Sequence, residues 1–179
     1  MNRLFSHPNI SIAIAEDIAA LTRLLNGAYR GESSRLGWTT EADLIAGDTR
    51  TNEQGVQQVI EQEGSVMLKY CNEAQEIIGC VNLQQRDQRL YLGMFSVLPQ
   101  LQGAGVGKQL LLAAEEHAKL QACNAIYMWV IAARVELISW YQRHGYQDTG
   151  ERIPFAEDGI SGIHLQKLAF MVLEKRLTH

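Results

Sequence analysis

The sequence lacks the features of a membrane or secreted protein. Its longest apolar stretches, such as Leu110 to Ala114, fall far short of the roughly 20 residues that a transmembrane helix needs. The first ten residues contain no apolar run of the kind that a signal peptide carries. The three cysteines, Cys71, Cys80 and Cys123, are an odd set without CxxC spacing. They predict reduced thiols in a cytoplasmic protein, with no disulfide framework and no membrane partner.

The chain also lacks a large excess of charge of either sign, because its formal net charge is only −4 at pH 7. A chain without a basic excess has no broad electrostatic attraction for nucleic acid, so we expect no nucleic-acid partner. A polyanionic ligand would have to be bound locally, by backbone amides and a few cations. The histidines lack HExxH or other paired-ligand spacing, so the sequence predicts no metal site.

The length and the hydrophobic pattern predict a single α/β domain over residues 1–179. The expected elements are, in chain order, a strand over 10–15, a helix capped by Asp17, a loop over 31–39, short helices over 41–47 and 52–62, a hairpin of strands over 65–71 and 76–84, a strand over 89–98, a helix over 105–121, a strand over 125–131, a helix over 135–144, a loop over 150–166 and a strand over 167–173. This order predicts a mixed sheet with helices packed on it.

Three alternate glycines, Gly103, Gly105 and Gly107, separate the strand that ends near Leu98 from the following helix. Glycines at these positions allow a tight turn and a close approach of the backbone to a ligand. The unpaired amides at the helix N-terminus and the helix dipole favour an anion, and a pyrophosphate is the natural guest. The alternative is a glycine-rich turn that only caps the helix.

The spacing of this loop does not fit the two common nucleotide loops. A Walker A loop needs glycine where Gln102 stands and Ser or Thr where Gln109 stands. A dinucleotide-binding loop has the spacing GxGxxG after the first strand, whereas this loop reads GxGxG and lies in mid-chain.

The signature that does fit is V-x-P-x-x-Q/R-G-x-G-x-G, with every defined position filled. Those positions are Val97, Pro99, Gln102, Gly103, Gly105 and Gly107. With this motif the chain resembles the GNAT superfamily of N-acetyltransferases. The resemblance implies acetyl-CoA as cosubstrate and a central mixed, mostly antiparallel sheet flanked by helices, with a splayed strand pair that binds CoA. The cofactor-binding residues that it implies are Phe95, Ser96, Val97, Gln102, Gly103, Ala104, Gly105, Val106, Gly107, Lys108 and Arg134.

The resemblance also implies how the strand before the loop works. In the family that strand carries a bulge and splays from the next strand, so that pantetheine pairs with it as an added strand would. The main chain of Phe95 and Val97 would make this pairing. An amide of Met94 or Phe95 would polarise the thioester carbonyl.

A second stretch, from Arg134 to Tyr146, resembles the family's helix motif Y-x-x-x-G-F/Y, with Tyr141, Gly145 and Tyr146 in place. The resemblance implies that Tyr141 is catalytic and serves the leaving thiolate. The alternative is a tyrosine packed in the core beside Trp140. Many family members have asparagine where this chain has Arg134, which could bind pantetheine or a phosphate, or face the acceptor.

The sequence leaves the general base open. Family members often place a glutamate on the strand before the glycine loop, but the strand over 89–98 has no carboxylate. Four residues remain as candidates, each of which could equally be a plain solvated charge: Glu32, Glu41, Glu151 and His164. For Cys80 and Cys123 a buried, inert thiol is favoured over a nucleophile.

We therefore predict a cytoplasmic N-acetyltransferase that transfers the acetyl group of acetyl-CoA to a primary amine of a small molecule by direct attack in a ternary complex. The acceptor is hypothesised to bind under the loop over 30–41, where Glu32 or Glu41 would face the amine and Trp38 could line the site or anchor the core. A peptide acceptor, at a protein N-terminus or a lysine, and a silent acyl-CoA-binding module are the alternatives. A homodimer is left open.

Overall fold

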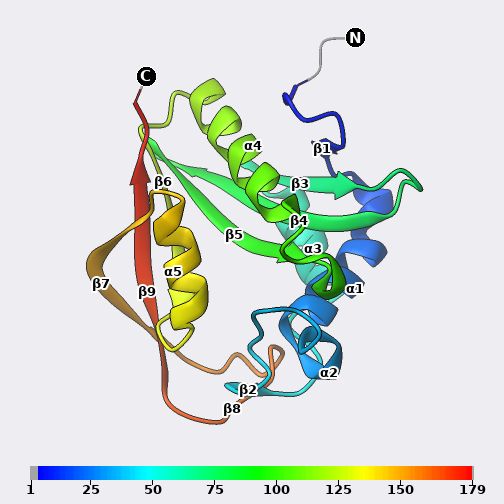
Figure 1. Cartoon of the computed structure of the whole chain (residues 1–179), viewed down its shortest axis with the longest axis vertical. Helices are drawn as coiled ribbons and strands as arrows, with labels where there is room; N and C mark the ends of the chain where they lie inside the picture. The colour runs from blue at the N-terminus through cyan, green and yellow to red at the C-terminus, as the bar shows by residue number, and fades with distance from the viewer. Residues whose placement is uncertain (1–3, 179) are drawn as a thin grey trace.

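The computed structural model describes residues 4–178, which form a seven-stranded sheet with the strand order β1-β3-β4-β5-β6-β9-β7 (Figure 1). The strands of this sheet are β1 (Ile10–Ile12), β3 (Ser65–Cys71), β4 (Ile77–Arg86), β5 (Arg89–Val97), β6 (Ala125–Ile131), β7 (Gln147–Phe155) and β9 (Leu168–Arg176). The α-helices are α1 (Ile18–Tyr29), α2 (Gly31–Ser34), α3 (Glu53–Glu61), α4 (Val106–Leu120) and α5 (Val135–Arg143). Neighbouring strands are antiparallel except β5 and β6, which are parallel. The predicted mixed, mostly antiparallel sheet flanked by helices is confirmed.

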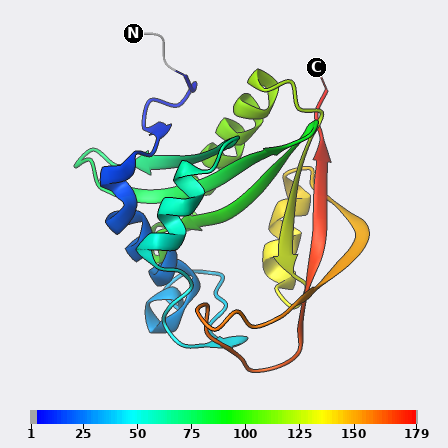
Figure 2. The same cartoon turned by 180° about the vertical axis from the view of Figure 1, so that it is seen from behind.

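Helices cover both faces of the sheet. α1 and α3 pack on one face, and α4 and α5 lie on the other (Figures 1 and 2). The core follows the alternation of side chains along a strand. Cys80 of β4 packs with residues of α1 and α3, whereas Val81 and Leu83 pack with residues of α4. None of the helices described between residues 4 and 178 is long and apolar enough to cross a membrane.

β5 and β6 are paired only at one end, where Arg89–Tyr91 lies beside Ala125–Tyr127. Beyond these residues the two strands diverge (Figure 1). A bulge bends β5 at this point, because its register with β4 shifts near Cys80 and Met94 has a left-handed backbone with a φ of 47°. Such a φ is uncommon outside glycine. The bulge and the splayed strand pair that the resemblance implies are both present, and they leave the end of β5 without a strand neighbour on the side of β6.

The region between α1 and β3 differs from the sequence prediction. The helix predicted over 41–47 is wrong, because this stretch is a turn followed by β2 (Ile45–Ala46), which pairs with β8 (Ile163–His164). Ile45 is fully buried against Ile131 and Leu168. In so short a segment, burial against distant residues outweighs a local helical tendency. The loop predicted before it contains the one-turn helix α2.

The predictions of a loop over 150–166 and of a helix capped by Asp17 also need correction. The loop predicted over 150–166 begins as a strand, because β7 pairs with the edge of β9. Nearly all of β7 is exposed, so no alternation of apolar and polar residues marks it in the sequence. The side chain of Asp17 does not cap α1. Its carboxylate instead accepts hydrogen bonds from the Ile14 amide (2.8 Å) and from Lys69 Nζ (2.7 Å).

Candidate active site

The glycine loop leads directly into the N-terminus of α4. Gly103 and Gly105 have φ values of 87° and 90°, and Gly105 is the N-cap of the helix. This left-handed backbone strains any residue with a side chain, which is why glycine is required here. A Cβ added to either glycine would meet no atom within 4 Å. The loop therefore presents its backbone, and the free amides of the first helical turn, to open space where an anion can approach.

A cavity of about 280 Å³ lies between this loop, the end of β5 and the helix α5. We call it the glycine-loop cavity. It is lined by Tyr141 and by these predicted cofactor residues: Phe95, Ser96, Val97, Gln102, Gly103, Gly105, Gly107, Lys108 and Arg134. Two predicted residues are not in the lining, since Val106 is buried in the core and Ala104 is exposed outside it. The structure thus brings two separate sequence motifs to one cavity.

Several polar groups of this cavity have no partner in the described part of the chain. Ser96 Oγ, Gln102 Oε1 and Arg134 Nε are buried and form no hydrogen bond. Buried polar groups without partners are costly, so a group of this kind in the lining of a cavity indicates a place where a ligand or water can bind. These groups offer a donor, an acceptor and a cation, so they fit the amides and phosphates of an acyl-CoA.

Gln102 has a more specific position than its place in the motif predicts. Its Nε2 donates a hydrogen bond to the carbonyl oxygen of Val97 (3.2 Å). Its amide also packs so closely on Gly37 that a Cβ there would overlap it. The side chain therefore ties the glycine loop to the end of β5, and the loop amides remain as the groups that face an anion.

The end of β5 has no strand beside it on the side that faces away from β4. The amide of Leu98 bonds to β4 through the carbonyl of Ile78 (2.8 Å). Because hydrogen-bonding groups alternate along an antiparallel strand, the backbone groups of Phe95 and Val97 point to the opposite side. Consistent with this, Tyr29 Oη donates to the carbonyl oxygen of Phe95 (2.8 Å). Tyr29, the last residue of α1, was not among the site residues predicted from the sequence.

Tyr141 lies between the glycine-loop cavity and a neighbouring cavity, where its hydroxyl can donate a hydrogen bond to a ligand. Its side chain is only 4% exposed, yet it lines both the glycine-loop cavity and the neighbouring cavity described next. The ring packs against Phe95 and Tyr146, with centroid separations of 6.1 and 5.8 Å. Burial, helped by the nearby Tyr29, raises the pKa of the Tyr141 phenol well above its usual value. The phenol therefore keeps its proton over the whole physiological pH range.

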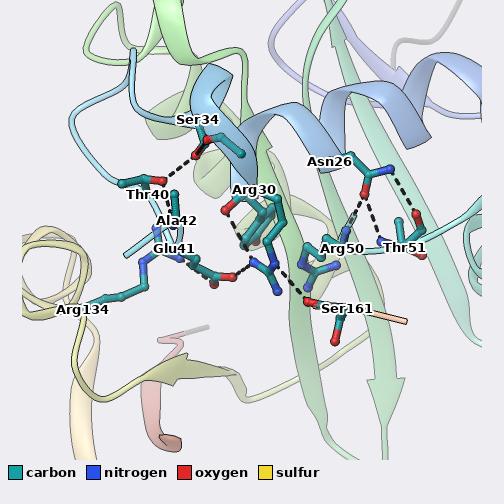
Figure 3. A network of polar contacts seen from close by, with 12 residues as sticks. Asn26, Arg30, Ser34, Thr40, Glu41, Ala42, Arg50, Thr51, Arg134 and Ser161 are labelled. Carbon is teal, nitrogen blue, oxygen red and sulfur yellow. Dashed lines mark hydrogen bonds and ion pairs between the residues drawn. The ribbon is translucent and has the colours of Figure 1, made fainter. Parts of the chain in front are cut away.

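A second cavity, of about 330 Å³, adjoins the first and lies where β5 and β6 diverge. We call it the arginine cavity, because Arg30, Arg50 and Arg134 line it. Glu41 joins two of them: Arg30 Nη1 binds its Oε2, and Arg134 Nη1 donates to its Oε1 (2.9 Å) (Figure 3). Arg30 Nε also donates to the carbonyl oxygen of Ser161 (3.1 Å). This network connects α1, the loop before β2, the start of α5 and the loop before β8.

Arg134 shows what replaces the usual asparagine. Besides its bond to Glu41, its Nη2 donates to Thr39 Oγ1 (2.8 Å), so both terminal nitrogens hold the loop before β2. Its Nε is buried and has no hydrogen-bond partner in the described part of the chain. The exposed indole of Trp38, on the same loop, lies 6.3 Å from the ring of Trp140 and lines the glycine-loop cavity instead of the arginine cavity.

The structure brings one of the four candidate bases to the site. Glu41 lines the arginine cavity, but both of its oxygens accept hydrogen bonds from buried guanidinium groups, which makes it a structural link. The side chain of Glu32 is 92% exposed and pairs with Arg35. Glu151 and His164 line neither cavity.

Asp158 is a further carboxylate in the lining of the arginine cavity. Partial burial raises the pKa of its carboxyl, but hydrogen bonds from Ser161 and Ile160 outweigh this, and the pKa is lowered overall. A carboxylate with a lowered pKa is a weak base. Cys80 is excluded as a nucleophile, because complete burial raises the pKa of its thiol to about 12 and leaves no thiolate at neutral pH.

Comparison with known proteins agrees with this geometry. Residues 41–169 match the family model described as the acetyltransferase (GNAT) domain. This match covers well over half of the sequence, and the chain belongs to the GNAT family of acetyltransferases. The family comprises acyl-CoA-dependent N-acetyltransferases, the class predicted from the glycine motif.

Individual relatives match a shorter part of the chain or have a lower sequence identity. The spermine/spermidine N(1)-acetyltransferase of Bacillus subtilis is 36% identical over 67 residues, which are 37% of this chain and 44% of that protein. The chain therefore spans less than half the length of that relative. Among solved structures, a GNAT-family acetyltransferase from Staphylococcus aureus superposes with a TM-score of 0.68 at 17% identity, covering 95% of this chain and 99% of that one. The ribosomal-protein-alanine N-acetyltransferase of Brucella melitensis superposes with a TM-score of 0.70 at 19% identity, covering 94% and 99%. At such identities these structures show the fold alone.

Proposed function

We propose that this protein transfers the acetyl group of acetyl-CoA to the primary amine of a small molecule, by direct attack in a ternary complex. The observation that carries the proposal is the junction of the two cavities. Both are lined by Phe95 and Tyr141, so a donor in one and an acceptor in the other can meet beside the bulge of β5. The arginine cavity, at about 330 Å³, has the size of a small-molecule site.

The glycine-loop cavity is the proposed donor site. Amides from Gly103 to Gly107 would hold the pyrophosphate at the N-terminus of α4, with the exposed Lys108 beside them. The free edge of β5 at Phe95 and Val97 would pair with the pantetheine chain. The buried, unpaired Ser96 Oγ supports a polar ligand at this edge.

In the transfer a nitrogen–carbon bond forms between the amine and the acetyl group, and the carbon–sulfur bond of the thioester breaks. The leaving thiolate must gain a proton, and Tyr141 is the donor that lines both cavities. A thiol pKa near 8.5 against a phenol near 10 makes full proton transfer uphill by about 2 kcal/mol, and burial makes it harder still. Tyr141 therefore stabilises the developing thiolate by a hydrogen bond, and solvent completes the protonation.

The amine must also lose a proton. Of the carboxylates that line the arginine cavity, Glu41 is held by two arginines and Asp158 has a lowered pKa. The amine proton is therefore released to water, and the reactive species is the neutral amine already present at the working pH.

A turnover assay tests the proposal. Purified protein is mixed with acetyl-CoA and single amines from a library, and free thiol is measured with a colorimetric thiol reagent. We expect at least one small primary amine to raise thiol release at least about tenfold above the amine-free rate, with the N-acetyl product visible by mass spectrometry. Calorimetric binding of acetyl-CoA without turnover on any amine or N-terminal peptide would instead identify a silent acyl-CoA-binding module.

A further inference from the structure

The arginine cavity has more positive than negative charge. The charged residues in its lining are Arg30, Arg50, Arg134, Glu41 and Asp158. Glu41 can neutralise only one of the two arginines that it joins. Asp158 accepts from the amide and the hydroxyl of Ser161, within its own loop. The cavity therefore disfavours a multiply cationic acceptor and favours one that carries an anion.

Arg50 is the cation in this cavity without a counter-ion. Its guanidinium lies over the ring of Tyr29, 4.3 Å from the centroid, and forms no hydrogen bond or ion pair with any residue described between 4 and 178. The backbone below it is fixed, because Asn26 Oδ1 accepts from the amides of Arg50 (2.7 Å) and Thr51 (3.0 Å) (Figure 3). A guanidinium has five N–H donors in a planar fork that matches a carboxylate. Arg50 is thus held in place with its donors free.

Tyr29 connects Arg50 to the place where the two cavities join. The same ring that stacks under Arg50 donates its hydroxyl to the carbonyl oxygen of Phe95, at the bulge of β5. An anion bound to Arg50 therefore lies one tyrosine ring from the point where the two cavities join. In an α-amino acid the carboxylate and the amine share one carbon atom, so an acid bound there has its amine close to this junction.

The lining of the arginine cavity is also rich in aromatic residues. They are Tyr91, Trp129, Phe155 and Phe170. Phe155 and Phe170 are stacked with centroids 4.3 Å apart, and Trp129 lies 5.9 Å from Phe170. Stacked rings of this kind bind flat or large apolar groups. The cavity therefore offers a cation to one end of an acceptor and an apolar surface to its body.

We propose that the acceptor is an α-amino acid with an aromatic or other large apolar side chain. Its carboxylate binds Arg50, its side chain packs on the wall of Trp129, Phe155 and Phe170, and its amine attacks the thioester. This inference rests on the proposed function. The amine nitrogen gains the acetyl group, one amine proton passes to water, and CoA leaves as the thiol, so the product is an N-acetylamino acid. A polyamine, the substrate named for the Bacillus subtilis relative, has no anion for Arg50.

The first test compares matched acceptors on the wild-type protein, so it depends on no variant. L-Phenylalanine, L-phenylalaninamide, glycine and spermidine are each titrated with saturating acetyl-CoA. We expect kcat/KM for phenylalanine to exceed that of the other three at least about tenfold. The amide is the sharpest control, because its amine is less basic and chemistry alone favours it. Equal or better turnover of the amide or of spermidine overturns the proposal, and equal turnover of glycine overturns its apolar part.

The second test removes the cation. Arg50→Gln should raise the KM for phenylalanine at least about tenfold and remove most of the preference for phenylalanine over phenylalaninamide, while the KM for acetyl-CoA stays within about twofold. Arg23→Gln, at an exposed position of α1, is the matched control and should behave as wild type. Arg50→Lys keeps the charge but not the fork, and should retain part of the preference. An unchanged phenylalanine KM in Arg50→Gln contradicts the assignment.

A binding measurement separates this inference from the proposed function. Calorimetry of phenylalanine and phenylalaninamide with the CoA-loaded protein needs no chemistry. Tighter binding of the acid than of the amide, lost in Arg50→Gln, supports the carboxylate site even if no amine is acetylated. Turnover of amines with no preference for the acid leaves the proposed function standing and removes the inference alone.

Discussion

Burial determines the chemistry of Tyr141 at the scale of a single residue. A phenol that is only 4% exposed cannot ionise easily, and its pKa is raised well above the usual value. We expect Tyr141→Phe to lower kcat by about ten- to a thousandfold, because the ring stays in the core while the donor to the thiolate is lost. Acetyl-CoA affinity, measured by calorimetry, should remain within a few-fold. An unchanged kcat would make Tyr141 a packing residue and water the proton donor.

The raised pKa of Tyr141 also predicts the pH profile of the wild-type enzyme. A group whose pKa is raised keeps its proton at every pH below that pKa, so the donor persists past pH 10, the usual value for a phenol. We expect kcat/KM to rise with pH as the amine loses its proton, with no descending limb below about pH 10. Initial rates of thiol release between pH 6 and 10 measure this profile. A descending limb near pH 8.5 would indicate a different, more acidic proton donor.

The N-terminus of α4 is the proposed binding site for the pyrophosphate of acetyl-CoA. Its N-cap, Gly105, has a left-handed backbone that asparagine and aspartate tolerate better than other side chains do. Gly105→Asn and Gly105→Asp are therefore a matched pair with equal size and different charge. We expect the aspartate variant to bind acetyl-CoA at least about tenfold more weakly than the asparagine variant, because its carboxylate repels the pyrophosphate.

Calorimetry measures both affinities, and circular dichroism confirms that both variants are folded. Equal affinities for the two variants would show that the pyrophosphate does not lie at this helix end.

Helices and strands with a clear local pattern in the sequence were predicted close to their observed bounds, and those without such a pattern were missed. The hairpin β3–β4, the helix α4 and the strand β6 stand close to their predicted bounds. Their apolar residues recur at helical or strand spacing, or their ends carry glycine and proline. β2, β7 and β8 were missed. β2 and β8 have two residues each, and β7 is exposed along most of its length, so these segments are strands only because β2 pairs with β8 and β7 pairs with β9.

Glu41 holds distant parts of the whole molecule together. It binds Arg30 and Arg134, and all three side chains are at most 8% exposed. Glu41→Gln leaves two buried cations without their anion, which typically costs about 3–5 kcal/mol. We expect a decrease of that order in the free energy of unfolding in urea. Glu32→Gln, at a side chain that is 92% exposed, is the control and should change stability by less than about 0.5 kcal/mol.

The outcome for Glu41→Gln also decides its chemical role. A variant that is destabilised but retains kcat confirms a structural link. A stable variant whose kcat falls and whose pH profile shifts would restore Glu41 as the general base.

The sequence by itself determined the family, the glycine loop and the sheet with its helical layers, because each depends on residues that are close neighbours in the chain. The loop needs glycine at φ values that its own backbone imposes, and a strand or helix shows its period within a few residues. The arginine cavity, which is the proposed acceptor site, was decided only by the tertiary structure. Glu41 and Arg134 are 93 residues apart, and Arg30 and Ser161 are 131 apart. No local spacing records such contacts, since they form only when the folded chain brings the loops before β2 and β8 to the cavity where β5 and β6 diverge.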